Sequence, residues 1–226
     1  MKSIKTKELE NVERIRGAEL IINNVMKNKK IRNILINLNE FNNYTFTHSI
    51  NVGILSVLIG NKLKLNKLEL YNLGVAALLH DVGKMFIGND IINKPSKLTN
   101  EEFEIIKKHP KLGCCYLEKY IDLDKSSYIG ILEHHEKYDG TGYPSKLAGN
   151  EISLFGRIIS IAYIYDALIY ERPYRQKVEH SEVIKFIKSN ANKHFDPKIV
   201  EVFVKNNFLI YGEYNLNLNI NNNLIC

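Results

Sequence analysis

The chain has 226 residues, of which 45% are hydrophobic, 25% are charged and only five are proline. This composition excludes an intrinsically disordered chain, and the length suits one large domain without a second one of ordinary size. The formal net charge is +6, but the basic residues are spread out and no nucleic-acid motif accompanies them. We therefore expect no DNA or RNA partner, although the positive field would favour a small phosphate-bearing substrate.

The sequence also predicts where the protein works. Its three cysteines form neither a disulfide framework nor a Cys-x-x-Cys zinc motif, which fits a reducing compartment. The N-terminus lacks the apolar stretch of a signal peptide. The most hydrophobic window, residues 152–170, contains Arg157 and Asp166, so it predicts a buried helix rather than a membrane span. We expect a cytoplasmic protein with no membrane partner.

Hydrophobic residues recur at three- and four-residue intervals along most of the chain, which predicts an all-α fold. The pattern indicates two helices over residues 7–38, then one over 45–62 and one over 66–81 that ends near Gly83. We divide the chain into an N-terminal helical extension, residues 1–40, and one helical-bundle domain, residues 41–226.

The second half of the chain carries clear helix-start signals. Thr99 and Glu102 form a capping box that predicts a helix with Ile105, His109, Leu112 and Tyr116 on one face, distorted by Pro110. Further helices are predicted over residues 128–135, over 153–170, after residue 181 and after an Asp196–Pro197 cap. Residues 214–220 alternate asparagine with apolar side chains, which fits either a small terminal strand or hairpin, or a frayed end.

Five of the seven histidines fall on three or four separate predicted helices, several of them on the apolar face. A single histidine there is more often a hydrogen-bonded core residue than a ligand. Several buried imidazoles would each need a polar partner, and one shared metal centre would satisfy them all. The candidate set is His48, His80, His109, His134 and His135, together with Asp81.

The adjacent pair His80-Asp81 limits the geometry of such a centre. Neighbouring helical residues point about 100° apart, so both reach one site only at a helix end, which Gly83 supplies. The two oxygens of Asp81 could bridge two cations. Imidazoles mixed with carboxylate suit Fe, Mn, Zn or Ni rather than Mg or Ca.

These residues belong to an ordered set of motifs. The main ones are HDVGK at 80–84, HHEKYDGTGYP at 134–144 and DALIYERPYR at 166–175. Supporting segments are HSINV at 48–52, KPSKLTNEE at 94–102, KKHPKLG at 107–113, RIISIA at 157–162 and FDP at 195–197. Over roughly residues 41 to 205 the chain resembles the HD-GYP subgroup of the HD phosphohydrolase superfamily.

The resemblance implies a metal-dependent phosphodiesterase that converts cyclic di-GMP, or a related cyclic dinucleotide, to a linear product through a metal-bound hydroxide. It implies that Asp81 bridges the metals and that the metal ligands are His48, His80, Asp81, His109, His134 and His135. Asp81 and Lys84 would be the catalytic residues. Substrate contacts would come from Lys84, Asp139, Gly142, Tyr143, Arg172 and Arg175. Without the motifs, the two arginines fit a solvated surface and Asp139-Gly140 fits a plain turn.

Two positions depart from the family pattern. Tyr163 stands where active members carry an aspartate ligand, and Tyr44 stands where three-metal members carry a glutamate. A phenol with a pKa near 10 is a poor ligand for Zn or Mn, although Fe(III) binds phenolate. We therefore expect one or two divalent transition metals, Fe or Mn before Zn or Ni. The ion at His48, His80 and Asp81 should be the looser one; Asp166, three residues after Tyr163, could compensate in part.

Three functions remain to be weighed. The leading one is the cyclic-dinucleotide phosphodiesterase. The alternative is a catalytically degenerate module that binds metal or nucleotide for signalling, which Tyr44 and Tyr163 favour. A mononucleotidase is disfavoured because it would need neither the DGTGYP loop nor the RPYR segment. A homodimer or a signalling-protein partner stays open.

Overall fold

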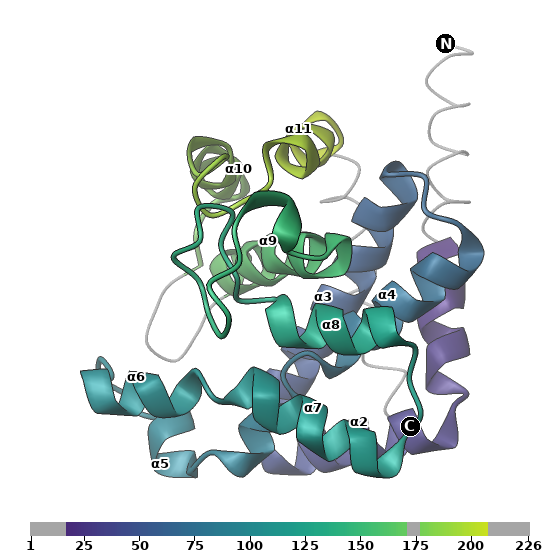
Figure 1. Ribbon diagram of the computed structural model, residues 1–226, viewed down its shortest axis with the longest axis vertical. Helices are drawn as coiled ribbons and strands as arrows, with labels where there is room; N and C mark the ends of the chain where they lie inside the picture. Colours follow the sequence, from purple (N-terminus) through teal and green to yellow (C-terminus); the bar gives the residue numbers. More distant parts are fainter. Residues whose placement is uncertain (1–16, 171–176, 208–226) are drawn as a thin grey trace.

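The computed structural model of the protein describes residues 17–170 and 177–207, and this part of the chain is helical, without a β-sheet (Figure 1). Residues 17–26 form a helix that precedes α2. The helices that follow are α2 (Lys29–Phe41), α3 (Asn43–Lys62), α4 (Lys67–Leu79), η1 (Val82–Phe86), α5 (Asn89–Ile92), α6 (Asn100–Ile106), α7 (His109–Tyr120), α8 (Lys125–Glu133), η2 (Gly149–Glu151), α9 (Leu154–Ile169), α10 (His180–Ser189) and α11 (Pro197–Lys205).

Helix α3 is the centre of the bundle. Residues 48–60 are all buried because α2, α4 and α9 pack around them. Helix α8 packs on α4 and α9, while α10 and α11 lie against the far side of α9 (Figure 1). Burial of apolar side chains from all these helices in one core supplies the main driving force for folding. The all-α prediction is confirmed.

Several local predictions are also confirmed. Helix α9 begins after a Ser153 cap and is largely buried. Asp196 caps α11, with Pro197 in its first turn. No helix among the described residues combines the length and the apolar character needed to cross a bilayer. The predicted terminal strand or hairpin at 214–220 lies outside the described residues, and the division at residue 40 stays a prediction.

The prediction of a single helix through Ile105 and Tyr116 was wrong. The Thr99 capping box does open α6, but α6 ends at Ile106 and α7 begins at His109. Pro110 explains the break: it has no backbone N–H, so it is tolerated in the first turn of α7 but not inside a continuous helix. His109 therefore lies at a junction between two helices.

A second helix end brings the His80-Asp81 pair to the same place. Helix α4 stops at Leu79, and the chain continues into η1, which packs on α7. The contact is so close that a Cβ atom at Gly83 would lie 1.9 Å from the backbone oxygen of His109. Only glycine allows this approach, and it holds the end of α4 beside the start of α7.

Candidate metal centre

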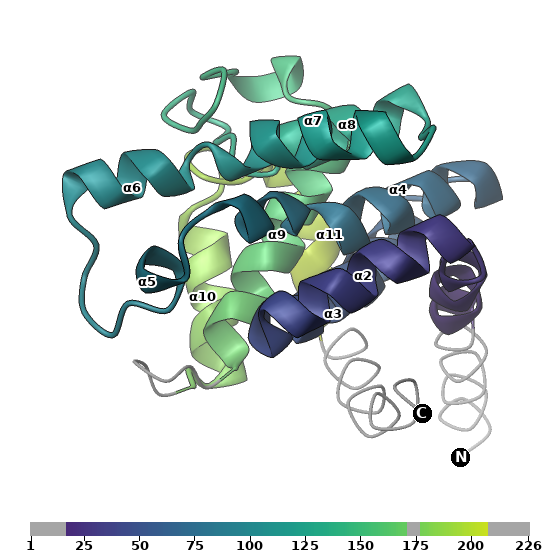
Figure 2. The ribbon, with the colours of Figure 1, turned by 90° about the horizontal axis from the view of Figure 1, so that it is seen from below.

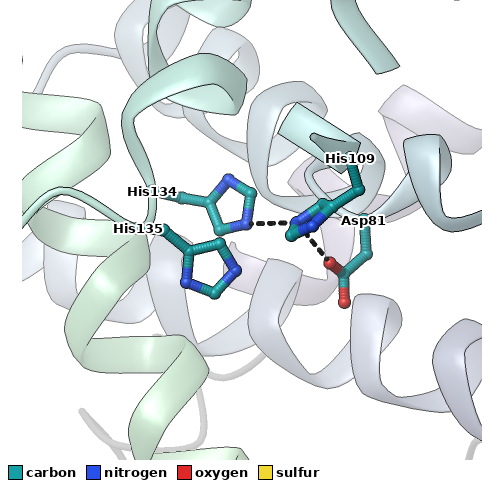
Figure 3. Close-up of side chains that lie close together, drawn as sticks. All are labelled: Asp81, His109, His134 and His135. Carbon is teal, nitrogen blue, oxygen red and sulfur yellow. Dashed lines mark hydrogen bonds and ion pairs between the residues drawn. The ribbon is translucent and has the colours of Figure 1, made fainter. Parts of the chain in front are cut away.

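The candidate ligands come from four helices and meet in the interior. His48 lies within α3, His80 and Asp81 follow α4, His109 begins α7, and His134 and His135 follow α8. Their donor atoms form two groups, each with its atoms within 4.8 Å of one another: Asp81, His109, His134 and His135, and His48, His80 and Asp81. Figure 3 shows the first group, in which His134 and His135 face His109 and Asp81. Asp81 belongs to both groups, so its carboxylate lies between them.

Three of the imidazoles are oriented by the helix ends on which they lie. Each directs its Nδ1 at the backbone carbonyl three residues earlier, a group that a helix end leaves unsatisfied. The pairs are His80 with Ala77 (2.7 Å), His109 with Ile106 (2.7 Å) and His134 with Ile131 (2.6 Å). A carbonyl accepts only, so Nδ1 carries the proton and the Nε2 lone pair is left for a metal.

His48 is oriented by a carboxylate instead. Its Nδ1 lies 2.5 Å from Oδ2 of Asp166, a residue of α9 that is itself buried. Its Nε2 points toward Asp81, 3.9 Å from Oδ2. A carboxylate behind a ligand imidazole fixes the tautomer and raises the basicity of the ring. Asp166 therefore orients the His48 ring so that Nε2 points toward Asp81.

The centre leaves polar atoms unsatisfied in a way that a cation would correct. His48 Nε2, His80 Nε2 and Asp81 Oδ1 are buried without a hydrogen-bond partner among the described residues. Asp81 Oδ1 lies 3.2 Å from Nε2 of His109, but with the proton on Nδ1 that nitrogen is also an acceptor. The Nε2 atoms of His109 and His134, both lone-pair acceptors, face each other at 3.2 Å. Each unsatisfied buried group costs about 1–3 kcal/mol. The residues present fit a divalent transition metal, whose usual ligands are imidazole and carboxylate.

The protonation states also suit metal binding. Burial lowers the pKa values of His109, His134 and His135, so these rings are neutral at pH 7. Burial alone would raise the pKa of Asp81, but the Lys84 ammonium, 2.7 Å from Oδ2, and the nearby His80 hold it well below its usual range. Neutral imidazoles beside an ionised carboxylate are the form that binds a metal.

The two unexpected tyrosines lie at this centre. The Tyr163 ring packs edge-on against the rings of His48 and His135, with centroids 5.1 and 4.9 Å apart. The Tyr44 ring stacks on His48 at 6.2 Å, as expected for a residue one helical turn earlier. A phenol ring therefore borders the His48 group where the pattern of the resembled family has a carboxylate.

A cavity of about 360 Å³ opens beside the centre. Two lysines line it, Lys84 and Lys94, and no carboxylate does among the described residues. The rest of its lining is mostly aromatic and aliphatic: Asn42, Tyr44, Thr45, Ile91, Ile92, Asn93, Leu98, Phe103, Ile106, His109, His135, Tyr143 and Tyr163. This lining suits an anionic ligand that also carries apolar rings.

The DGTGYP loop brings only its tyrosine to the cavity. Tyr143 stacks on His135, with centroids 4.7 Å apart and planes 22° apart, and burial raises the pKa of its hydroxyl. Asp139 is exposed and accepts hydrogen bonds from Thr141, while Gly142 packs against the backbone of residues 135–137. Neither Asp139 nor Gly142 lines the cavity, so their contact with substrate stays a prediction.

Sequence reasoning missed the residue that holds this loop. The carboxylate of Glu136 is buried and accepts hydrogen bonds from the backbone amides of Ser145 (2.6 Å) and Leu147 (3.2 Å). Its place directly after the histidine pair was the only signal. Arg172 and Arg175, predicted to hold substrate phosphates, lie outside the described residues.

The chain also matches known proteins. The family model described as "HD domain" matches residues 31–199. A cyclic di-GMP phosphodiesterase of Pseudomonas aeruginosa is 38% identical over 174 residues, which cover 76% of this chain and 41% of that protein. The 3'3'-cGAMP-specific phosphodiesterase 3 of Vibrio cholerae is 38% identical over 176 residues, which cover 76% and 37%.

Solved structures show the same fold. An HD-GYP protein of Bdellovibrio bacteriovorus aligns with a TM-score of 0.58 at 22% identity, over 70% of this chain and 50% of that one. The HD domain of the L. monocytogenes phosphodiesterase PgpH, in complex with cyclic di-AMP, aligns with a TM-score of 0.56 at 16% identity, over 81% and 96%. The chain spans less than half the length of the curated relatives cited above. With its motifs, its fold and these relatives together, the chain belongs to the HD domain family, as a member of the HD-GYP type.

Proposed function

We propose that this chain is a metal-dependent phosphodiesterase that hydrolyses cyclic di-GMP or a related cyclic dinucleotide to a linear product. The observation that carries the proposal is the group of buried imidazoles around Asp81 at the wall of a cavity lined by lysines and aromatic rings. The names of the relatives, which specify cyclic di-GMP and 3'3'-cGAMP, support this substrate class. The expected cytoplasmic location remains part of the proposal.

The residues of the centre would have separate roles in binding metal and substrate. His48, His80, His109, His134 and His135 would hold divalent metal with Asp81 between the two groups. Metal bound there would supply positive charge to the scissile phosphodiester and lower the pKa of a water molecule toward neutrality. Lys84 would donate a hydrogen bond to a non-bridging phosphate oxygen. The Tyr143 hydroxyl, whose pKa burial raises, would remain protonated and act as a donor.

We further propose that the two groups differ in metal affinity. The group of Asp81, His109, His134 and His135 offers four ligands, whereas His48, His80 and Asp81 offer three beside the Tyr163 ring. Fe or Mn are the expected metals, with Zn or Ni next. Substituting Tyr163→Asp should raise the metal content measured after purification without added metal. Unchanged metal content would contradict this account of the weaker ion.

The enzymatic proposal is tested by turnover. Mn- or Fe-loaded protein should convert cyclic di-GMP to a linear dinucleotide, followed by liquid chromatography. His80→Ala should abolish turnover because it removes a ligand with an unsatisfied buried nitrogen. His180→Ala is the matched control, since that histidine lies outside the centre and contacts Tyr165. Turnover that survives His80→Ala would refute the proposal.

The second candidate is a signalling module without efficient turnover. The observation that favours it is the pair of tyrosines, Tyr44 and Tyr163, at the His48 group. It predicts measurable binding of cyclic di-GMP with no product under any of the four metals. A homodimer or a signalling-protein partner is compatible with either function and stays a prediction.

A further inference from the structure

The cavity has a second lysine that the proposed chemistry does not use. Lys94 follows α5, and its ammonium donates to both carboxylate oxygens of Glu102, at 2.7 and 2.6 Å. Glu102 also accepts from the backbone amide of Thr99 in the α6 capping box. Lys94 is thus held at the cavity wall by a carboxylate that is itself fixed to the start of α6.

The position of Lys94 differs from that of Lys84. Lys84 lies on η1, and its ammonium contacts Asp81 between the two ligand groups. Lys94 belongs to the segment that joins α5 and α6, which project together from one side of the bundle (Figure 2). Two lysines on separate elements therefore line one cavity, and only one of them touches the ligand cluster.

The two lysines of the cavity offer N–H donors at two separate places on its wall. An ammonium has three donors, and the two contacts with Glu102 leave Lys94 able to donate to a ligand. Each lysine is paired with a carboxylate, Lys84 with Asp81 and Lys94 with Glu102, but neither carboxylate lines the cavity. A cyclic dinucleotide carries two phosphodiesters, and only one of them can lie at the His–Asp centre.

We propose that Lys94 binds the second, unbroken phosphodiester of the substrate while the first lies at the centre beside Lys84. The inference rests on the proposed function, which it deepens by assigning the other half of the substrate. Glu102 is the positioning residue that keeps the Lys94 ammonium at the cavity wall between binding events.

The test compares Lys94→Gln with Lys97→Gln in the full chain loaded with Mn. Lys97 lies three residues away, is exposed and does not line the cavity, so it controls for the loss of one positive charge. Two substrates are used: cyclic di-GMP, and bis(4-nitrophenyl) phosphate, which has one phosphodiester. Binding of cyclic di-GMP is measured separately by calorimetry.

We expect Lys94→Gln to raise KM and Kd for cyclic di-GMP by about tenfold or more, the value of one charge-assisted hydrogen bond. Its kcat, and its activity on the single phosphodiester, should stay near those of Lys97→Gln, because only uniform binding is lost. Lys94→Arg should restore most of the affinity. Equal losses on both substrates, or no difference from Lys97→Gln, would overturn the inference.

The two proposals fail in different ways. Wild-type protein that binds cyclic di-GMP without turnover would refute the enzymatic proposal, and the Kd ratio would still decide the role of Lys94. Wild-type protein that neither binds nor cleaves cyclic di-GMP would refute both.

Discussion

The contact between Asp166 and His48 makes a quantitative prediction about metal binding. Asp166 lies on α9 and His48 on α3, 118 positions earlier, and both side chains are at most 2% exposed. Substituting Asp166→Asn keeps an oxygen that accepts from Nδ1 but removes the negative charge behind the ring. The imidazole becomes less basic, and Nε2 becomes a weaker metal ligand.

The magnitude follows from the role of Asp166 behind a ligand. Removing such a partner typically lowers metal affinity about 10- to 100-fold, or about 1.4–2.8 kcal/mol. The loss should fall on the group of His48, His80 and Asp81 alone. The group with His109, His134 and His135 takes its ring orientation elsewhere, from backbone carbonyls in two of the three cases.

The assay is a calorimetric titration of metal-free protein with Mn, fitted to two sites. Asp196→Asn is the matched control, because Asp196 is also buried and ion-paired, with Arg157 at 2.5 Å, but belongs to the α11 cap. The control should lose stability and keep both metal affinities. Equal weakening of both sites by Asp166→Asn, or no weakening of either, would refute the reasoning.

Three further substitutions test the architecture around the centre. Gly83→Ala should lower the free energy of unfolding by about 3 kcal/mol or more, because the Cβ of the alanine would overlap the His109 carbonyl. Unfolding in urea measures this loss, and an unchanged midpoint of the urea transition would contradict the close contact. Glu136→Gln leaves one of two loop amides without its acceptor and should lower the free energy of unfolding by about 1–3 kcal/mol. The variant should lose activity and keep its metal content. Loss of metal would contradict a role confined to the loop. Burial lowers the pKa of His194 to about 4, so between pH 6.5 and 4 the unfolded chain binds a proton that the folded chain does not, and stability falls as the pH falls. Between pH 7 and pH 5 the free energy of unfolding should fall by about 2 kcal/mol because of His194, and the His194→Gln variant should not show this loss. An unaltered pH dependence in the variant would show that His194 is not the group responsible.

Much of the architecture follows from local sequence. Apolar spacing determined the helices, and short-range caps determined where α6, α9 and α11 begin, because a cap needs only residues within one turn. The end of α4 beside the His80-Asp81 pair was equally predictable, from Gly83. The candidate ligands could be named because several buried imidazoles require polar partners wherever the helices pack.

The tertiary structure alone decided how those side chains are used. The pairing of His48 with Asp166 joins helices far apart in sequence, and no local pattern specifies which carboxylate stands behind which ring. Lys94 and Lys97 belong to the same motif, and nothing in the sequence distinguishes their roles. Only Lys94 lines the cavity, because the packing of α5 and α6 places it at the cavity wall. Spacing along a chain determines which face of a helix a residue occupies. What that face meets depends on the docking of other helices, which is a property of the whole core.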